Sequence, residues 1–207
     1  VEYSIYYTWA RSSYSIIREK KSLKIVMKDW ELEKLKYPIG KFEWEPKMSK
    51  KRFEFHKKKI TDYPNILEEE IKDYTIADLK KSYRPGGWQV AQIIHHLADS
   101  HTHNYIRFKQ ALLVNTPTIM DYKPADWAST ADATFKDISG SLQMIKGIHN
   151  RWSILLNSIE LENLDRSYFH PNREKKYPLH VVLALYSWHG DHHLEHIKSA
   201  FKSEYFQ

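Results

Sequence analysis

Apolar residues recur at steps of three and four over most of this sequence, which is the spacing of an amphipathic α-helix. The pattern is clearest over 138–159, where the repeated positions are Ile138, Leu142, Ile145, Trp152, Leu156 and Ile159. Similar spacing predicts a helix over roughly 64–73, with an alternative start near Ser49. It also predicts a short helix over 76–83 and two long ones over 88–113 and 178–202.

Proline and glycine set the ends of these predicted helices. Pro85-Gly86-Gly87 is a strong breaker before the helix that Trp88 opens, and Pro178 stands where proline favours a first helical turn. Residues 114–136 are predicted to form a long loop, and loops of that length are usually functional or well packed. No segment shows a convincing alternation typical of strands. Four helices joined by long connections predict an all-α fold, a four-helix bundle.

The first 36 residues differ from the rest of the chain. Residues 1–26 are rich in tyrosine and serine and show no clear period, whereas Met27 opens a stretch that resembles a natural start. We therefore predict an N-terminal extension over 1–36, with Met27 as a candidate initiator, and a helical bundle domain over 37–207. The alternative is an N-terminal helix that packs on the bundle.

Composition narrows the functional classes. No apolar run approaches the ~18 residues of a membrane span, and no secretory signal is recognised, so we expect a cytoplasmic protein without a membrane partner. The chain has no cysteine, so a metal ion would need histidine or carboxylate ligands and any thiol would come from outside. The net charge is +6, of which residues 1–26 carry +3. This distribution favours a solvated surface over nucleic-acid binding.

The most informative segment is the histidine-rich run near the C-terminus. His189 and His193 lie four residues apart, so on a helix both imidazoles occupy one face, the spacing that offers two ligands to one ion. That face is also the apolar one, and burying two imidazoles without partners is costly. We therefore predict metal binding over simple packing. The pair His192 and His196 has the same spacing and is the competing choice.

A second histidine-rich run could supply a third ligand. His96 shares a helix face with Asp99 and Arg107 and lies at the flank of the apolar stripe. We predict Asp99 as the partner of a ligand or as a base, Tyr186 as a group that orients substrate, and Arg107 as the receiver of an anionic group. His95 is expected to serve packing. His103, His192 and His196 are expected to be outer partners of the ligands or surface groups, and not ligands themselves.

Three histidine ligands leave an open position on the ion, as in catalytic rather than structural sites. Such an ion lowers the pKa of bound water towards ~7 and equally binds and deprotonates a thiol. The sequence therefore predicts a metal-dependent enzyme acting on a small molecule, by hydrolysis or by thiol transfer. The competing hypotheses are a non-catalytic metal-binding stress protein and a basic nucleic-acid-binding protein.

Several motifs together resemble the YfiT-like branch of the DinB superfamily, over residues from about 37 to 202. They are Tyr37-Pro38-Ile39-Gly40-Lys41-Phe42-Glu43-Trp44, Tyr83-Arg84-Pro85-Gly86-Gly87-Trp88, His95-His96-Leu97-Ala98-Asp99-Ser100-His101, Tyr105-Ile106-Arg107-Phe108-Lys109 and the run after Trp188. The resemblance implies a DinB-like four-helix bundle whose metal ligands correspond to His96, His189 and His193. The stretch before Met27 is absent from the family pattern.

The same resemblance implies an activity and an assembly. It implies a homodimeric metal-dependent hydrolase with one zinc or nickel ion per chain. Related proteins are thiol S-transferases that use bacillithiol or another low-molecular-weight thiol, which makes such a thiol the expected co-substrate of the alternative reaction.

Overall fold

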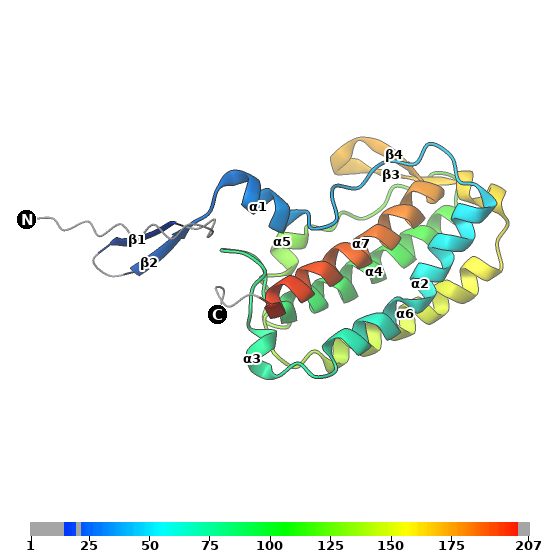
Figure 1. Ribbon diagram of the computed structural model, residues 1–207. Coiled ribbons are helices and arrows are strands. Elements are labelled where there is room, and N and C mark those ends of the chain that lie inside the picture. Colours follow the sequence, from blue (N-terminus) through cyan, green and yellow to red (C-terminus); the bar gives the residue numbers. More distant parts are fainter. Residues whose placement is uncertain (1–14, 20–21, 203–207) are drawn as a thin grey trace, which may run out of the picture.

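The computed structural model describes residues 15–19 and 22–202, and four long helices form its body (Figure 1). They are α2 (Lys50–Ile71), α4 (Val90–Leu113), α6 (Ser139–Asn157) and α7 (Leu179–Lys202). The predicted all-α four-helix bundle is therefore confirmed.

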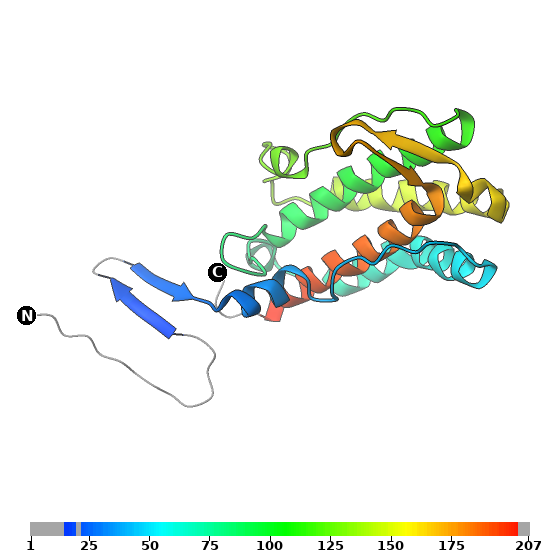
Figure 2. The same ribbon diagram turned by 90° about the horizontal axis from the view of Figure 1, so that it is seen from above.

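Each long helix of the bundle packs against two others. The pairs in contact are α4 with α6, α6 with α2, α2 with α7 and α7 with α4, so that α2 lies diagonally opposite α4 (Figures 1 and 2). The bonded pairs His95–Ser141 and His101–His149 show that α4 and α6 run in the same direction. The contacts from His96 to His189 and from Ser100 to Tyr186 show that α7 runs opposite to α4.

The long connections follow from this helix order, because a helix cannot reach a parallel or diagonal neighbour through a tight turn. The first connection holds α3 (Ile76–Leu79), and the second holds α5 (Pro124–Trp127). The third contains the 3-10 turns η1 (Leu161–Asp165) and η2 (Pro171–Arg173) and the strands β3 (Ser167–His170) and β4 (Lys175–Pro178).

Two hydrogen bonds tie the second connection to the third. The amide of Ile119 donates to the carbonyl of Phe169 at 3.0 Å, and the amide of Phe169 donates to Pro117 at 2.9 Å. The predicted loop over 114–136 is thus held beside β3 and is interrupted by α5. This attachment positions the residues that follow it, including Tyr122.

The predicted start of the first long helix at residue 64 is wrong, and the alternative start near Ser49 is confirmed. The Ser49 hydroxyl accepts from the amide of Arg52 at 3.2 Å, as an N-cap side chain does. Pro64 lies inside α2, where it removes one hydrogen bond of the helix and costs about 3 kcal/mol or more. Buried apolar contacts on both sides of Pro64 keep α2 continuous.

The expectation of no strands is also wrong. Strands β3 and β4 pair antiparallel, and Pro178 ends β4 instead of opening α7. Two buried tyrosines face each other across this hairpin, Tyr168 and Tyr177, with ring centroids 5.8 Å apart. Strands of four residues are too short for a visible alternation, which is why the sequence pattern missed them.

A second hairpin lies ahead of the bundle in the chain. Strand β1 (Ser15–Glu19) pairs with β2 (Ser22–Val26), and α1 (Asp29–Lys36) follows and contacts α7. The predicted extension over 1–36 thus includes a helix that packs on the bundle, while residues 1–14 and 20–21 of it lie outside the described residues. The boundary between extension and domain stays a prediction.

The interior of the bundle has two apolar clusters with a histidine layer between them. One cluster includes Ile60, Trp152 and Tyr186, and the other includes Tyr63, Ile145 and Leu194. The histidine layer comprises His96, His101, His149, His189 and His193, which come from α4, α6 and α7. All but His96 lie at positions between the two clusters along their helices, and His96 lies beside residues of the second cluster. Because this layer is nearly enclosed by apolar side chains, the bonding of its nitrogens decides what the site can do.

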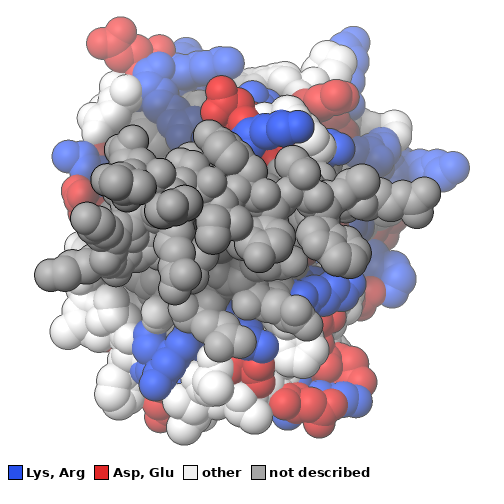
Figure 3. Space-filling view, turned by 60° about the vertical axis from the view of Figure 1, so that its left-hand side comes forward, with Lys and Arg blue, Asp and Glu red and all other residues white. Residues whose placement is uncertain are grey.

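The described surface is mixed in charge. On the face drawn in Figure 3, lysine and arginine side chains are interspersed with aspartate and glutamate. No helix in the described part of the chain has the length and apolar character needed to cross a membrane.

Gly190 sets the distance between α7 and α2. A Cβ atom at this position would lie 2.8 Å from a ring carbon of Tyr63, closer than real contacts allow. The ring belongs to the buried core, so the helices would have to separate. We expect Gly190→Ala to lower the free energy of unfolding by about 1–3 kcal/mol, measured by urea denaturation.

Gly147 provides the matched control, because it lies in α6 with open space around it. Gly147→Ala should raise the free energy of unfolding by about 0.5–1 kcal/mol through helix propensity alone. Equal effects of the two variants would contradict the close packing of α7 on α2.

Candidate metal centre

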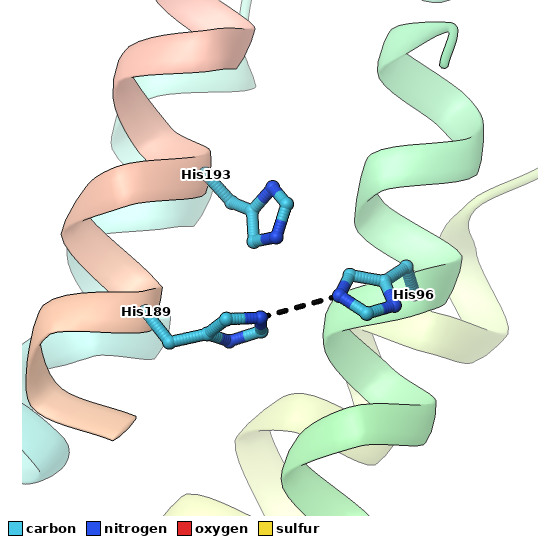
Figure 4. Close-up of side chains that lie close together, drawn as sticks. All are labelled: His96, His189 and His193. Atoms are coloured by element: carbon cyan, nitrogen blue, oxygen red, sulfur yellow. Dashed lines mark hydrogen bonds between the residues drawn. The ribbon is translucent and has the colours of Figure 1, made fainter. Parts of the chain in front are cut away.

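The structure brings His96, His189 and His193 together (Figure 4). His189 and His193 lie one turn apart on α7, and His96 faces them from α4. Each offers one ring nitrogen, and these three atoms all lie within 4.8 Å of one another, so the group could hold a metal ion. The two histidine-rich runs therefore meet as the sequence pattern indicates.

Burial keeps these imidazoles neutral. Desolvation lowers the pKa of His96 to about 4, and it lowers the pKa values of His189 and His193 well below the ordinary value. Neighbouring histidines in the group add to this effect, because a second positive charge nearby would be unfavourable. Neutral imidazole is the form that binds a metal ion, so the site presents ligands without first losing protons.

His96 and His189 each point one ring nitrogen toward the other and one away from the group. Nε2 of His96 and Nε2 of His189 face each other at 3.2 Å. The Nδ1 atoms face outward: His96 Nδ1 lies 2.9 Å from the Tyr122 hydroxyl, and His189 Nδ1 lies 3.1 Å from Nε2 of His101. Such outer partners orient the rings of metal-binding histidines.

A second group of histidines on α7 shares His193 with the first. His192, His193 and His196 could also hold an ion. However, Nε2 of His196 donates to the carbonyl of Lys36 at 3.2 Å, so its Nδ1 is an acceptor, and that atom lies 3.3 Å from Nδ1 of His193. Both ring nitrogens of His196 are therefore used in hydrogen bonds, which favours the group containing His96.

The structure gives Tyr122 the contact that the sequence predicted for Asp99. The hydroxyl of Tyr122, not the carboxylate of Asp99, bonds Nδ1 of His96. Asp99 lies one turn further along α4, and burial followed by the charge of Asp99 raises the pKa of Tyr122. Burial, followed by the nearby Asp132, raises the pKa of Asp99 itself. The role of Asp99 as a base stays a prediction.

Tyr186 is buried beside the histidines. Its ring centroid lies 5.4 Å from that of His189, and its hydroxyl lies 3.3 Å from the Ser100 hydroxyl. Desolvation raises the pKa of Tyr186, so its hydroxyl is protonated at neutral pH.

Arg107 is buried, with 7% of its surface exposed. Its Nη2 donates to the carbonyl of Met120 at 2.6 Å, and it makes no ion pair with any carboxylate among the described residues. Burial raises the pKa of both Tyr122 and Tyr186, and the positive charge of Arg107 opposes part of this shift. A buried cation without an anionic partner is unusual in proteins.

Sequence reasoning missed three residues of this centre. Tyr122 fell within a predicted loop, and its place depends on the attachment of that loop to β3. His101 stood in the recognised histidine run, but its position gave no sign of a partner on another helix. His149 occupies the apolar face of α6 between Ile145 and Trp152, and this placement was the signal that could have revealed it.

Comparisons with known proteins agree with the fold. The sequence model of the DinB superfamily matches residues 61–197, which include all three histidines of the group. A Bacillus cereus protein named “Putative metal-dependent hydrolase” is 42% identical over 168 residues, covering 81% of this chain and 96% of that protein. A Bacillus anthracis protein of the same name is 41% identical over the same shares of each chain.

A solved structure shows the same architecture. YfiT from Bacillus subtilis, described as “a probable metal-dependent hydrolase with an unusual four-helix bundle topology”, matches with a TM-score of 0.77 and 36% identity. The match covers 80% of this chain and 94% of that chain.

The neutral histidines make stability depend on pH in the metal-free protein. The unfolded chain binds protons below the ordinary histidine pKa of 6.5, whereas the pKa values of folded His96 and His149 are about 4. Because the unfolded state binds more protons in this range, the free energy of unfolding should fall as the pH is lowered from 6.5 towards 4. The loss by pH 5 is about 1.5 kcal/mol for each of these residues.

Urea denaturation of the chelator-treated protein at pH 7.5, 6 and 5 measures this dependence. His149→Gln, which removes one such group, should show a shallower fall. Equal stability at pH 7.5 and pH 5 would contradict the burial of neutral imidazoles.

Proposed function

The chain belongs to the DinB superfamily, and we propose that it is a metal-dependent hydrolase that acts on a small-molecule substrate. His96, His189 and His193 would hold one divalent ion, for which zinc and nickel are the candidates because both accept imidazole ligands. The observation that carries the proposal is the convergence of three neutral imidazoles from two helices, of which His96 and His193 are buried and His189 is partly buried. The names of the similar Bacillus proteins support it.

The donor set fits an ion. Nε2 of His96 and Nε2 of His189 lie 3.2 Å apart, so two lone pairs would repel each other there unless a proton or a cation stood between them. No carboxylate belongs to the group, so its ligands would not neutralise any of the positive charge of a bound divalent ion. When bound, the ion supplies Lewis acidity that makes a coordinated water or thiol nucleophilic near neutral pH.

The chain's own residues would then handle substrate and protons. Asp99, whose pKa is raised, would serve as the base that accepts a proton. Tyr186, protonated and one turn from His189, would orient the substrate through its hydroxyl. Arg107 would bind an anionic group of the substrate, because its buried guanidinium lacks a carboxylate partner among the described residues.

Metal analysis of untagged protein tests the ligand set. His96→Ala should remove the bound ion, whereas His192→Ala should retain about one ion per chain. The pair discriminates the two histidine groups, since both contain His193 but only one contains His96. The opposite result would assign the ion to His192, His193 and His196. Wild-type protein that folds but takes up neither zinc nor nickel would contradict the proposal.

A substrate screen tests the reaction. Activated esters and amides, with and without an anionic group, are offered to the metal-loaded protein in the absence and presence of a low-molecular-weight thiol. Turnover with water alone supports hydrolysis, and it should be faster for the anionic members, with Arg107→Gln removing that preference. Turnover only with added thiol would replace hydrolysis by thiol S-transfer, for which bacillithiol is a candidate co-substrate. A loaded protein without turnover under any condition would indicate a non-catalytic metal-binding protein.

A further inference from the structure

A line of hydrogen-bonded imidazoles leads from the candidate ligand His189 across the bundle to α2. Nδ1 of His189 lies 3.1 Å from Nε2 of His101, and Nδ1 of His101 lies 2.7 Å from Nε2 of His149. Nδ1 of His149 lies 2.6 Å from the carbonyl oxygen of Ile60. The line therefore begins at the candidate metal centre and ends on a backbone carbonyl.

The carbonyl at the end fixes the direction of every hydrogen bond in this line. A carbonyl oxygen only accepts, so Nδ1 of His149 must carry the proton, and its Nε2 must accept from His101. The same reasoning applied to His101 makes its Nε2 an acceptor for Nδ1–H of His189. A neutral imidazole has one ring proton, so Nε2 of His189 keeps a free lone pair.

A shorter line acts in the same way on His193. Nε2 of His196 lies 3.2 Å from the carbonyl oxygen of Lys36, and Nδ1 of His196 lies 3.3 Å from Nδ1 of His193. The carbonyl again requires the proton on Nε2 of His196, which leaves Nδ1 as the acceptor. His193 must therefore donate from Nδ1, and its Nε2 is left free.

Both terminal carbonyls are ones that the helices leave without a backbone partner. Ile60 lies four residues before Pro64, and proline has no amide proton to donate to it. Lys36 is the last residue of α1, where carbonyls lack an intrahelical donor. The proline inside α2 and the end of α1 thus each supply an acceptor to the histidine network.

We propose that His101, His149 and His196 are positioning residues that fix the Nδ1–H tautomer of His189 and His193 before a metal ion binds. This inference rests on the proposed ligand set and adds residues that act through the ligands. The free tautomer of histidine in water favours Nε2–H, so the network imposes the less common form. Removing such outer partners typically weakens metal binding about 10- to 100-fold.

His96 differs from the other two ligands, because its outer partner is a hydroxyl. The Tyr122 hydroxyl can donate to Nδ1 of His96 or accept from it. Without metal, Nε2–H of His96 can donate to the free Nε2 of His189, 3.2 Å away. With metal, the proton moves to Nδ1 and the hydroxyl turns. Only His96 should therefore change tautomer when the ion binds.

Long-range proton–nitrogen NMR spectra report which ring nitrogen carries the proton. In the metal-free protein at pH 7.5, His189, His193, His101 and His149 should show Nδ1–H, and His196 should show Nε2–H. Addition of zinc should change the tautomer of His96 alone. Nε2–H tautomers of His189 and His193 in the metal-free protein would overturn the proposal. The tautomers of the metal-free protein can be measured without any ion. This test therefore still decides the proposal if zinc does not bind and the proposed function is wrong.

Zinc affinity, measured by competition with a chromophoric chelator, separates positioning from general packing. His149→Leu removes the acceptor for His101 and should weaken zinc binding about 10-fold or more. His149→Gln keeps an oxygen that accepts and an amide that donates, so it should recover most of the affinity. The matched control is His95→Leu, because buried His95 also makes two hydrogen bonds, to Ser141 and Phe135, but none to a ligand.

Stability is measured on the same variants. His95→Leu should lose stability in urea while its zinc affinity stays within about threefold of the wild type. Equal losses of zinc affinity in His95→Leu and His149→Leu, or no recovery of affinity in His149→Gln, would show that these residues affect zinc binding through packing alone. If His149→Leu does not fold, the wild-type tautomers and the His149→Gln affinity still decide the question.

Discussion

The burial of a histidine layer at the centre of an apolar bundle is the constraint on which the rest of this structure depends. Each imidazole has two nitrogens, and neither can be left without a partner away from water at low cost. Most of these nitrogens face one another or a backbone carbonyl, and those that remain converge between α4 and α7. The interior is therefore a bonded polar network, in which a metal ion would complete the pattern.

The order and direction of the helices position the partners of this layer. Because α4 and α6 run in the same direction, their connection must travel the length of the bundle, and it passes beside β3 on the way. That path delivers Tyr122 to His96 and the carbonyl of Met120 to Arg107. Tight turns between antiparallel neighbours would place no residue there. The long connections thus build one wall of the candidate site.

The sequence revealed the parts of this arrangement that follow from helical spacing. The bundle and the face shared by His189 and His193 depend on the 3.6-residue period, which a single sequence displays. The contact of Tyr122 with His96 depends instead on a loop attached to a four-residue strand, and neither has a local signature. His149 was overlooked because one polar residue in an apolar stripe has no partner until α2 and α4 are placed around it. Pro64 was misread because a proline usually marks a helix end, and only tertiary packing keeps α2 continuous through it.

Two local irregularities acquire a common meaning in the folded chain. A proline in the middle of α2 weakens that helix, and the end of α1 leaves carbonyls without donors, so each is a local cost. In the assembled bundle, each places a free carbonyl at the end of a line of imidazoles, where it sets the direction of all the bonds behind it. Each irregularity weakens only its own helix, but the carbonyl that it leaves free sets the hydrogen-bond directions at the candidate metal centre. Because Lys36 belongs to α1, that helix takes part in ordering His193 although it precedes the bundle in the chain.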